Sequence, residues 1–152
     1  MFLCPPQEII LVLLLILMAK YPYTVLPGEI TPVYKPLIPV LLNCKKTHKI
    51  TPPINALVDS GADVCFCAKN IGLWLGIQFK KKRPYTFTTA NKTPFQAMKE
   101  EVILYTAGTR LTCPFFFTDT LPKETPVILG QQGFFENFRI TFDVRSKIIE
   151  IL

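Results

Sequence analysis

From Tyr21 onward, the chain consists of short apolar runs that Pro, Gly or Asn interrupts at intervals of about ten residues. Such spacing is typical of an all-β sandwich or barrel, because each run has the length of a strand and few reach the length of a helix. The strands that we expect are 33–42, 50–58, 64–68, 84–90, 95–105, 110–118, 127–129, 139–143 and 147–151. The two short helices that we expect are 69–75 and 132–138. The sequence therefore predicts an all-β fold with little helix.

The composition agrees with one folded domain. Of the 152 residues, 49% are apolar and only 18% are charged, so a core can form and a disordered chain is excluded. The 12 phenylalanines, 5 tyrosines and single tryptophan supply much of the volume for that core. We expect a single domain over 21–152.

Residues 1–20 differ from the rest and contain an uninterrupted apolar run at 9–19. As a helix this run would extend about 16 Å, whereas the hydrocarbon core of a bilayer is about 30 Å thick. A signal peptide would carry basic residues before the run, but Gln7 and Glu8 stand there. Three interpretations of this hydrophobic leader stay open: a signal-like segment, a membrane anchor, or a translation start at Met18. With the leader the protein could be tethered to a membrane, and without it we expect a cytoplasmic protein.

The chain is basic, with 17 Lys and Arg against 11 Asp and Glu and a net charge of +6. The densest basic run, 80–83, stands alone before Pro84 and lacks the Gly-aromatic signature of an RNA-binding sheet. A solvated turn is the simpler interpretation of this run. A small barrel that binds nucleic acid is the least favoured alternative, and its affinity would fall steeply with salt.

Several kinds of chemistry lack the residues that they need. His48, the only histidine, lies among lysines in an expected turn, so a serine or cysteine triad has no suitable base. Cys65 and Cys67 alternate with Phe66 and would point to one face of a strand, but a zinc site needs four donors and the other cysteines are distant. We therefore expect free thiols, no metal and no cofactor, and the sequence has no Gly-rich phosphate loop.

The segment that most suggests a catalytic role is Ala-Leu-Val-Asp-Ser-Gly-Ala-Asp at 56–63. Here an apolar strand ends in Asp59, Ser60 and Gly61. An ionised carboxylate at the end of a buried strand must be hydrogen-bonded or paired, and a glycine lets backbone N–H groups approach it. Taken alone, D-S-G is also an ordinary strand-to-turn sequence.

A second apolar strand, 126–129, also runs into a glycine, Gly130. Together, the segments 58–63 and 128–130 resemble the retropepsin-like aspartic proteases, in which a D-[ST]-G-A loop is paired with a later apolar-apolar-G segment. The order of elements agrees as well: the Asp strand, a helix, a hairpin flap at 88–97, the apolar-apolar-G strand and a C-terminal helix. The resemblance covers 21–152 and is greatest to the small cellular members of the family.

The resemblance implies a closed β-barrel of the acid-protease type that acts as a homodimer, since the chain has only one D-S-G. Each copy would supply Asp59, and the two carboxyl groups would activate a water that hydrolyses a peptide bond. The implied function is an aspartic endopeptidase acting on extended, mainly hydrophobic peptide segments. The alternative is a catalytically silent barrel of the same ancestry that binds peptides or serves in dimerisation.

The resemblance assigns further residues to the site. Ser60 would join the two catalytic loops across the dimer axis, and Gly61 would allow close approach of the backbone. The residues expected to contact substrate are Ala62, Asp63, Ala90, Asn91 and Lys92. The residues expected to support the site are Ile128, Leu129 and Gly130.

The flap departs from that of the viral enzymes, which carry several glycines at the hairpin tip. The segment 89–95 has no glycine, and we expect Asn91 to adopt the left-handed conformation there instead. The basic run 80–83 would lie near the base of the flap and favour acidic or neutral peptide segments.

Overall fold

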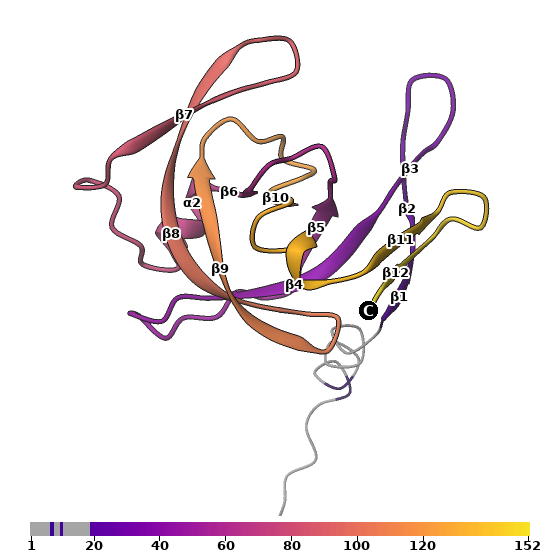
Figure 1. The fold of residues 1–152 in the computed structure, drawn as a ribbon, viewed down its shortest axis with the longest axis horizontal. Helices are drawn as coiled ribbons and strands as arrows, with labels where there is room; N and C mark the ends of the chain where they lie inside the picture. Colours follow the sequence, from indigo (N-terminus) through magenta and orange to yellow (C-terminus); the bar gives the residue numbers. More distant parts are fainter. Residues whose placement is uncertain (1–6, 8–9, 11–18) are drawn as a thin grey trace, which may run out of the picture.

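The computed structural model describes residues 7, 10 and 19–152. Its centre is a closed barrel of six strands in the order β4-β5-β10-β6-β9-β8, closed by the pairing of β4 with β8 (Figure 1). The barrel strands are β4 (Leu37–Asn43), β5 (Ile54–Val58), β6 (Cys65–Ala68), β8 (Pro94–Thr106), β9 (Thr109–Thr118) and β10 (Val127–Leu129). Within the described residues, strand β7 (Pro84–Thr88) pairs only with β8 and extends the sheet beyond the barrel.

The barrel closes around a core because its strands alternate apolar side chains inward. In β4, for example, Ile38, Val40 and Leu42 have no exposed surface. In β6 the two cysteines, Cys65 and Cys67, belong to this core. Phe66 between them points to the opposite face, where it belongs to a second cluster.

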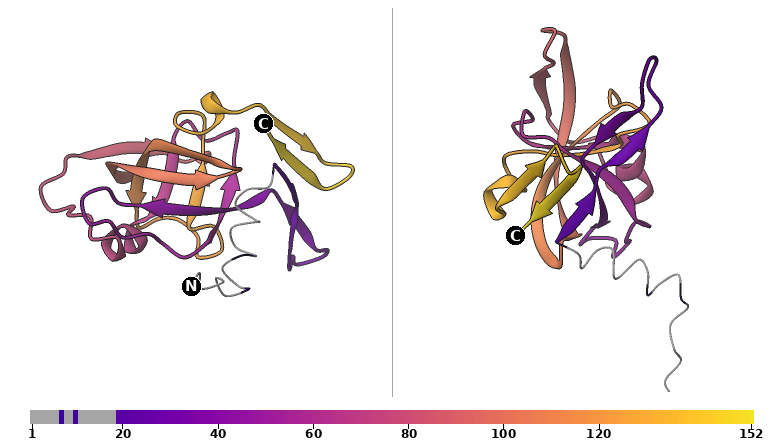
Figure 2. Two further views of the ribbon diagram at one scale, coloured as in Figure 1. Left: turned by 90° about the horizontal axis from the view of Figure 1, so that it is seen from below. Right: turned by 90° about the vertical axis from the view of Figure 1, so that its right-hand side faces the viewer.

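Two small sheets lie outside the barrel. Strands β1 (Lys20–Pro22), β12 (Ile148–Ile151) and β11 (Ile140–Asp143) form one, and strands β2 (Thr24–Leu26) and β3 (Val33–Lys35) form the other. Figure 2 shows both hairpins extending from the same end of the barrel. The Nζ of Lys147 lies 5.0 Å from the ring centroid of Tyr34, which links the β11–β12 turn to β3.

The predicted all-β barrel with short helices is confirmed, while several predicted strand boundaries are wrong. The strand expected at 33–42 is broken at Pro36 into β3 and β4, and the strand expected at 50–58 begins only at Ile54, after Pro52 and Pro53. Proline has no N–H to donate to a ladder, so it ends or divides a strand. Strands β1 and β2 were not predicted; each is three residues long, β1 ends in Pro22 and β2 is followed by Pro27.

Of the two predicted helices, one is confirmed and one is wrong. Helix α2 (Lys69–Trp74) matches the helix expected at 69–75. The helix expected at 132–138 is wrong, because only the single 3₁₀ turn η1 (Phe135–Asn137) forms there. Gly133 adopts a positive φ of 94°, which interrupts any α-helix beginning before it.

The hydrophobic leader predicted for 1–20 lies largely outside the described residues. Within the part of the chain that the structure describes, no helix combines the length and the apolar character needed to span a bilayer.

Candidate active site

Asp59 follows directly on β5, where β5 and β10 run parallel. Val58 pairs with Leu129 in this register, and the Asp59 N–H donates a hydrogen bond to the Leu129 carbonyl oxygen (3.0 Å). The backbone of Asp59 is thereby fixed to the end of β10. The residue is half-buried, so its carboxylate is partly open to solvent.

The turn after Asp59 donates two backbone hydrogen bonds back to this residue. The Gly61 N–H donates to Asp59 Oδ1 (2.9 Å), and the Ala62 N–H donates to the Asp59 carbonyl oxygen (3.2 Å). A Cβ atom on Gly61 would lie 3.2 Å from Oδ1, which is tighter than an ordinary contact. The bond from Gly61 therefore orients the carboxylate at short range without interference from a side chain.

Gly130 lies where the end of β10 meets the loop that carries Asp59. A Cβ atom there would lie 2.2 Å from the Val64 carbonyl oxygen and 2.7 Å from the Ala62 carbonyl oxygen. The two residues after Gly130 continue the contact, since the N–H groups of Gln131 and Gln132 donate to the carbonyl oxygens of Ala62 (2.8 Å) and Asp63 (2.9 Å). Only glycine fits this approach of two backbones.

Gln131 is a site residue that sequence reasoning missed. Its side-chain Nε2 donates to the Ser60 carbonyl oxygen at 2.7 Å, in addition to the bond from its backbone to Ala62. One residue thus holds two carbonyl groups of the loop 59–63. Its place directly after Gly130 was the available signal, but a glutamine that bonds to a distant backbone leaves no pattern in the sequence.

The other residues predicted for this region differ in exposure. Ser60 and Asp63 are exposed, and Ala62 is half-buried. Leu129 is fully buried in the barrel core, whereas Ile128 is half-buried and packs against the outer cluster around Phe66. The structure therefore brings the loop 59–63 and the segment 128–130 together.

The flap hairpin connects β7 to β8 and has an exposed tip at Ala90, Asn91 and Lys92. Lys92, with a φ of 64°, adopts the left-handed conformation, so the expectation for Asn91 is wrong. Asn91 instead uses its side-chain Oδ1, which accepts hydrogen bonds from the Thr89 hydroxyl and from the Thr93 N–H (3.2 Å). Among the described residues, the hydrogen bonds of the tip stay within the hairpin.

Comparison with solved structures places this arrangement in a known fold. The chain matches a retropepsin-like aspartic protease from Rickettsia conorii with a TM-score of 0.54 and 18% identity, over 76% of this chain and 89% of that one. The chain has a retropepsin-like fold. EIAV protease, complexed with the inhibitor HBY-793, also matches at 18% identity, with a TM-score of 0.49 over 69% of this chain and 88% of that one. No protein-family model matches the sequence, and no curated protein matches it.

In this retropepsin-like fold, an aromatic cluster fills the space between the flap and the outer face of the barrel. The rings of Phe66, Phe87, Phe95 and Phe116 lie within contact distance, with Phe87 edge-on to Phe66 (centroids 5.1 Å apart) and to Phe116 (5.0 Å). Phe87 and Phe95 stack across the hairpin at 5.7 Å. These contacts fix the base of the flap on β6 and β9.

The basic run 80–83 of this retropepsin-like chain directly precedes β7. Lys82 forms an ion pair with Glu100 of β8, and Lys46 pairs with the same carboxylate at 3.4 Å. Burial raises the pKa of Glu100, while the hydrogen bonds and charges of the two lysines lower it. The lysines together outweigh burial, so the pKa lies below its ordinary value. Lys82 is thus engaged in the fold, while Lys80, Lys81 and Arg83 are exposed.

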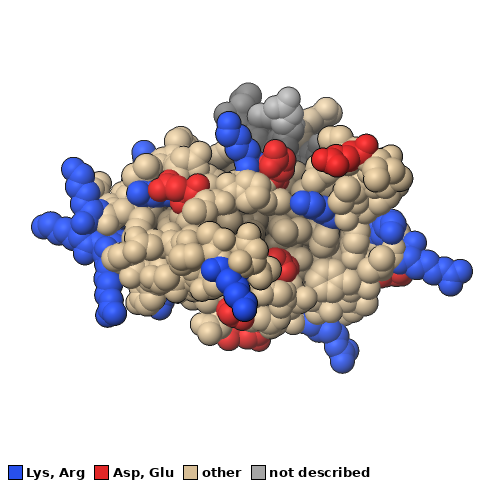
Figure 3. Space-filling view, turned by 90° about the horizontal axis from the view of Figure 1, so that it is seen from above, with Lys and Arg blue, Asp and Glu red and all other residues tan. Residues whose placement is uncertain are grey.

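Lys and Arg side chains project from both ends of the face seen in Figure 3. No group of three or more His, Cys, Asp and Glu residues among the described residues is arranged to hold a metal ion.

Proposed function

We propose that the chain is an aspartic endopeptidase whose active site is shared between two copies, each supplying Asp59. One observation carries the proposal: Asp59 is half-buried, its backbone is bonded to the end of β10, and its carboxylate accepts a hydrogen bond from the Gly61 N–H, within a retropepsin-like fold. Binding a peptide by itself requires no such carboxylate.

The chemistry requires two carboxyl groups, and each chain has one D-S-G loop. In aspartic proteases generally, two carboxyl groups about 3 Å apart share one proton, because both cannot ionise. The ionised carboxylate removes a proton from a water held between the two groups. That water attacks the peptide carbonyl, and the protonated carboxyl donates its proton to the carbonyl oxygen and later to the leaving nitrogen.

The remaining residues support this chemistry in the proposal. Ser60, exposed beside Asp59, joins the two loops across the dimer axis. Gly130 and Leu129 hold the loop in place from beneath. The residues proposed to contact the peptide are Ala62, Asp63, Ala90, Asn91 and Lys92, and Ile128 supports the site from β10.

The substrate is an extended peptide with apolar side chains near the cleaved bond. Ile128 in β10, the strand that precedes Gly130, packs with the aromatic cluster and supplies apolar surface beneath the flap. A flap hairpin recognises extended chains by adding their backbone to its sheet, which favours unfolded segments over folded domains.

The test is cleavage of an unfolded protein by the full chain between about pH 4 and pH 7, the range in which a carboxyl pair changes protonation. Activity should rise faster than linearly with enzyme concentration and be abolished in Asp59→Asn. The matched control is Asp119→Asn, which removes an exposed carboxylate that pairs with Lys69 and should leave activity unchanged. A folded, dimeric protein without activity would favour the silent barrel instead.

A further inference from the structure

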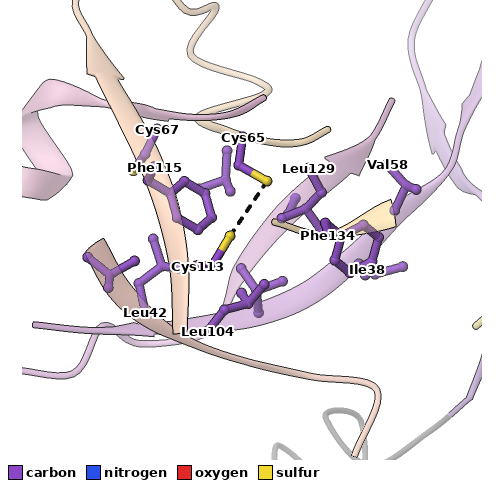
Figure 4. Close-up of a cluster of buried hydrophobic side chains, with 14 of the residues drawn as sticks. Ile38, Leu42, Val58, Cys65, Cys67, Leu104, Cys113, Phe115, Leu129 and Phe134 are labelled. Carbon is purple, nitrogen blue, oxygen red and sulfur yellow. Dashed lines mark hydrogen bonds between the residues drawn. The ribbon is translucent and has the colours of Figure 1, made fainter. Parts of the chain in front are cut away.

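Two thiols from neighbouring strands face each other inside the barrel. Cys65 of β6 and Cys113 of β9 have their sulfur atoms 3.8 Å apart, and both residues have no exposed surface. Figure 4 shows the two side chains directed at each other within the apolar core. The proposed peptidase chemistry uses neither of them.

The pair lies directly beneath the segment that holds the Asp59 loop. The Gly130 N–H donates to Cys65 Sγ at 3.3 Å, and the Cys65 S–H donates to the Gln132 carbonyl oxygen at 3.5 Å. A Cβ atom on Gly133 would lie 2.6 Å from Cys113 Sγ. The two thiols are therefore in contact with the same turn, 130–133, that donates hydrogen bonds to Ala62 and Asp63.

The two thiols are chemically unequal. The hydrogen bond donated by the Cys113 S–H lowers the pKa of Cys65, and the Gly130 N–H lowers it too, against the opposing effects of burial and of Glu136. The pKa of Cys113 is raised, first by that same bond and then by burial. Cys67, two residues from Cys65 on the same strand, has its pKa raised by burial. Cys65 is the one of these three thiols whose pKa is lowered, so we take it as the attacking thiol.

We propose that Cys65 and Cys113 form a dithiol site that hydrogen peroxide converts to an intramolecular disulfide. The proposal concerns thiol chemistry in the barrel core and holds whether or not the chain is a peptidase.

The reaction proceeds in two balanced steps. The Cys65 thiolate attacks peroxide, so that an S–O bond forms, the O–O bond breaks, and the released hydroxide takes up a proton as water. Cys113 then attacks the Cys65 sulfenic acid, so that the S–S bond forms, the S–O bond breaks, and the hydroxide leaves as water with the Cys113 proton. In sum, two thiols and one peroxide give one disulfide and two waters.

Peroxide must reach a buried pair, and the turn 130–133 is the nearest route. Gln131 and Gln132 on this turn are exposed and directly follow Gly130, which contacts Cys65. Local opening of such a surface turn requires less free energy than global unfolding. Oxidation should therefore be slow compared with an exposed thiol but complete without unfolding.

The disulfide would alter the turn above it. An S–S bond is about 2.05 Å long, so the two sulfur atoms must approach each other by roughly 1.7 Å. That movement draws Cys65 away from the Gly130 N–H and leaves a buried donor without its acceptor. We expect the amides of Gly130 and Gln131 to exchange with solvent several-fold faster in the oxidised protein.

The experiment treats the native full chain with hydrogen peroxide, blocks remaining thiols under denaturing conditions, and determines intact mass and linked peptides by mass spectrometry. We expect a loss of two hydrogen atoms, a peptide pair joined through Cys65 and Cys113, and full reversal by dithiothreitol. A different cysteine pair, or sulfinic acid at Cys65 without any disulfide, would overturn the proposal.

Variants supply the controls. In Cys113→Ala the sulfenic acid at Cys65 should persist and react with dimedone, whereas Cys67→Ala should still form the disulfide. Identification of the linked peptides in the wild-type chain tests the Cys65–Cys113 disulfide even if a variant does not fold. Loss of the disulfide in Cys67→Ala, with the fold retained, would contradict the assignment. Peptidase activity is measured separately, so its absence would bear only on the proposed function.

Discussion

Gly130 has little freedom to change, because two carbonyl oxygens occupy the space that a Cβ atom would need. Gly130→Ala should lower the free energy of unfolding by about 3 kcal/mol, since backbone rather than a flexible side chain has to move. Urea denaturation measures this loss. Gly61→Ala is the matched control, because its Cβ would meet only the Asp59 carboxylate at 3.2 Å, and it should cost less stability. Equal losses in the two variants would contradict this account.

Gln131 allows a second test at the scale of one side chain. Gln131→Ala removes the 2.7 Å hydrogen bond to the Ser60 carbonyl oxygen but keeps the backbone bond to Ala62. With a hydrogen bond contributing about 1 kcal/mol, we expect kcat to fall several-fold with little change in the fold. Gln132→Ala, at the next exposed position, should leave kcat unchanged, and similar losses in both variants would rule out a specific role of Gln131.

The loop 56–63 was predictable because an apolar strand ending in a carboxylate and a glycine has few structural solutions. The contribution of Gln131 was not predictable, because its side chain bonds to a backbone carbonyl 71 positions away. Every residue type has such a carbonyl, so the sequence gives no sign of the pair. The left-handed residue of the flap was assigned to Asn91 on propensity, but Asn91 uses its side chain as an acceptor within the turn, and Lys92 takes the positive φ.

At the scale of elements, the flap turn gives a direct test of this assignment. Lys92→Gly should stabilise the protein by about 1 kcal/mol, because glycine adopts a positive φ without the steric penalty of a side chain. Asn91→Gly should destabilise it, because the hydrogen bonds to Thr89 and Thr93 are lost. Thermal denaturation of the two variants distinguishes the positions, and the opposite order of stabilities would show that the turn is wrongly assigned.

The contact of Glu100 with Lys82 and Lys46 joins β8 to the basic run and to the turn before Ile50. The pKa of Glu100 is lowered in the folded state, so its contribution to stability is present above the pKa of an unfolded glutamate and is lost as pH falls through the lower folded value. The free energy of unfolding of wild type should exceed that of Glu100→Gln by about 1 kcal/mol at neutral pH. This difference should vanish in acid. Urea denaturation over a pH series measures it, and a constant difference would contradict the ionic origin.

Between elements, prediction succeeded where the pattern was local and failed where it was not. The alternation of Cys65, Phe66 and Cys67 predicted that both thiols share one face of a strand, and both belong to the barrel core while Phe66 belongs to the second cluster. The pairing of β1 with β12 joins the two ends of the described domain, and three-residue strands carry too little pattern to reveal it. The segment 132–138 contains helix-compatible residues, but the positive φ of Gly133 limits it to one 3₁₀ turn.

At the scale of the whole molecule, the barrel presents one Asp59, and the proposed chemistry requires two. The central claim is therefore that two chains complete one site. The most direct measurement mixes wild type with Asp59→Asn at constant total concentration, allows the copies to exchange, and follows peptide cleavage. A shared site predicts that activity falls with the square of the wild-type fraction, because only dimers with two intact carboxyls are active. Activity that falls in simple proportion to that fraction would show that each chain works alone and would contradict the account.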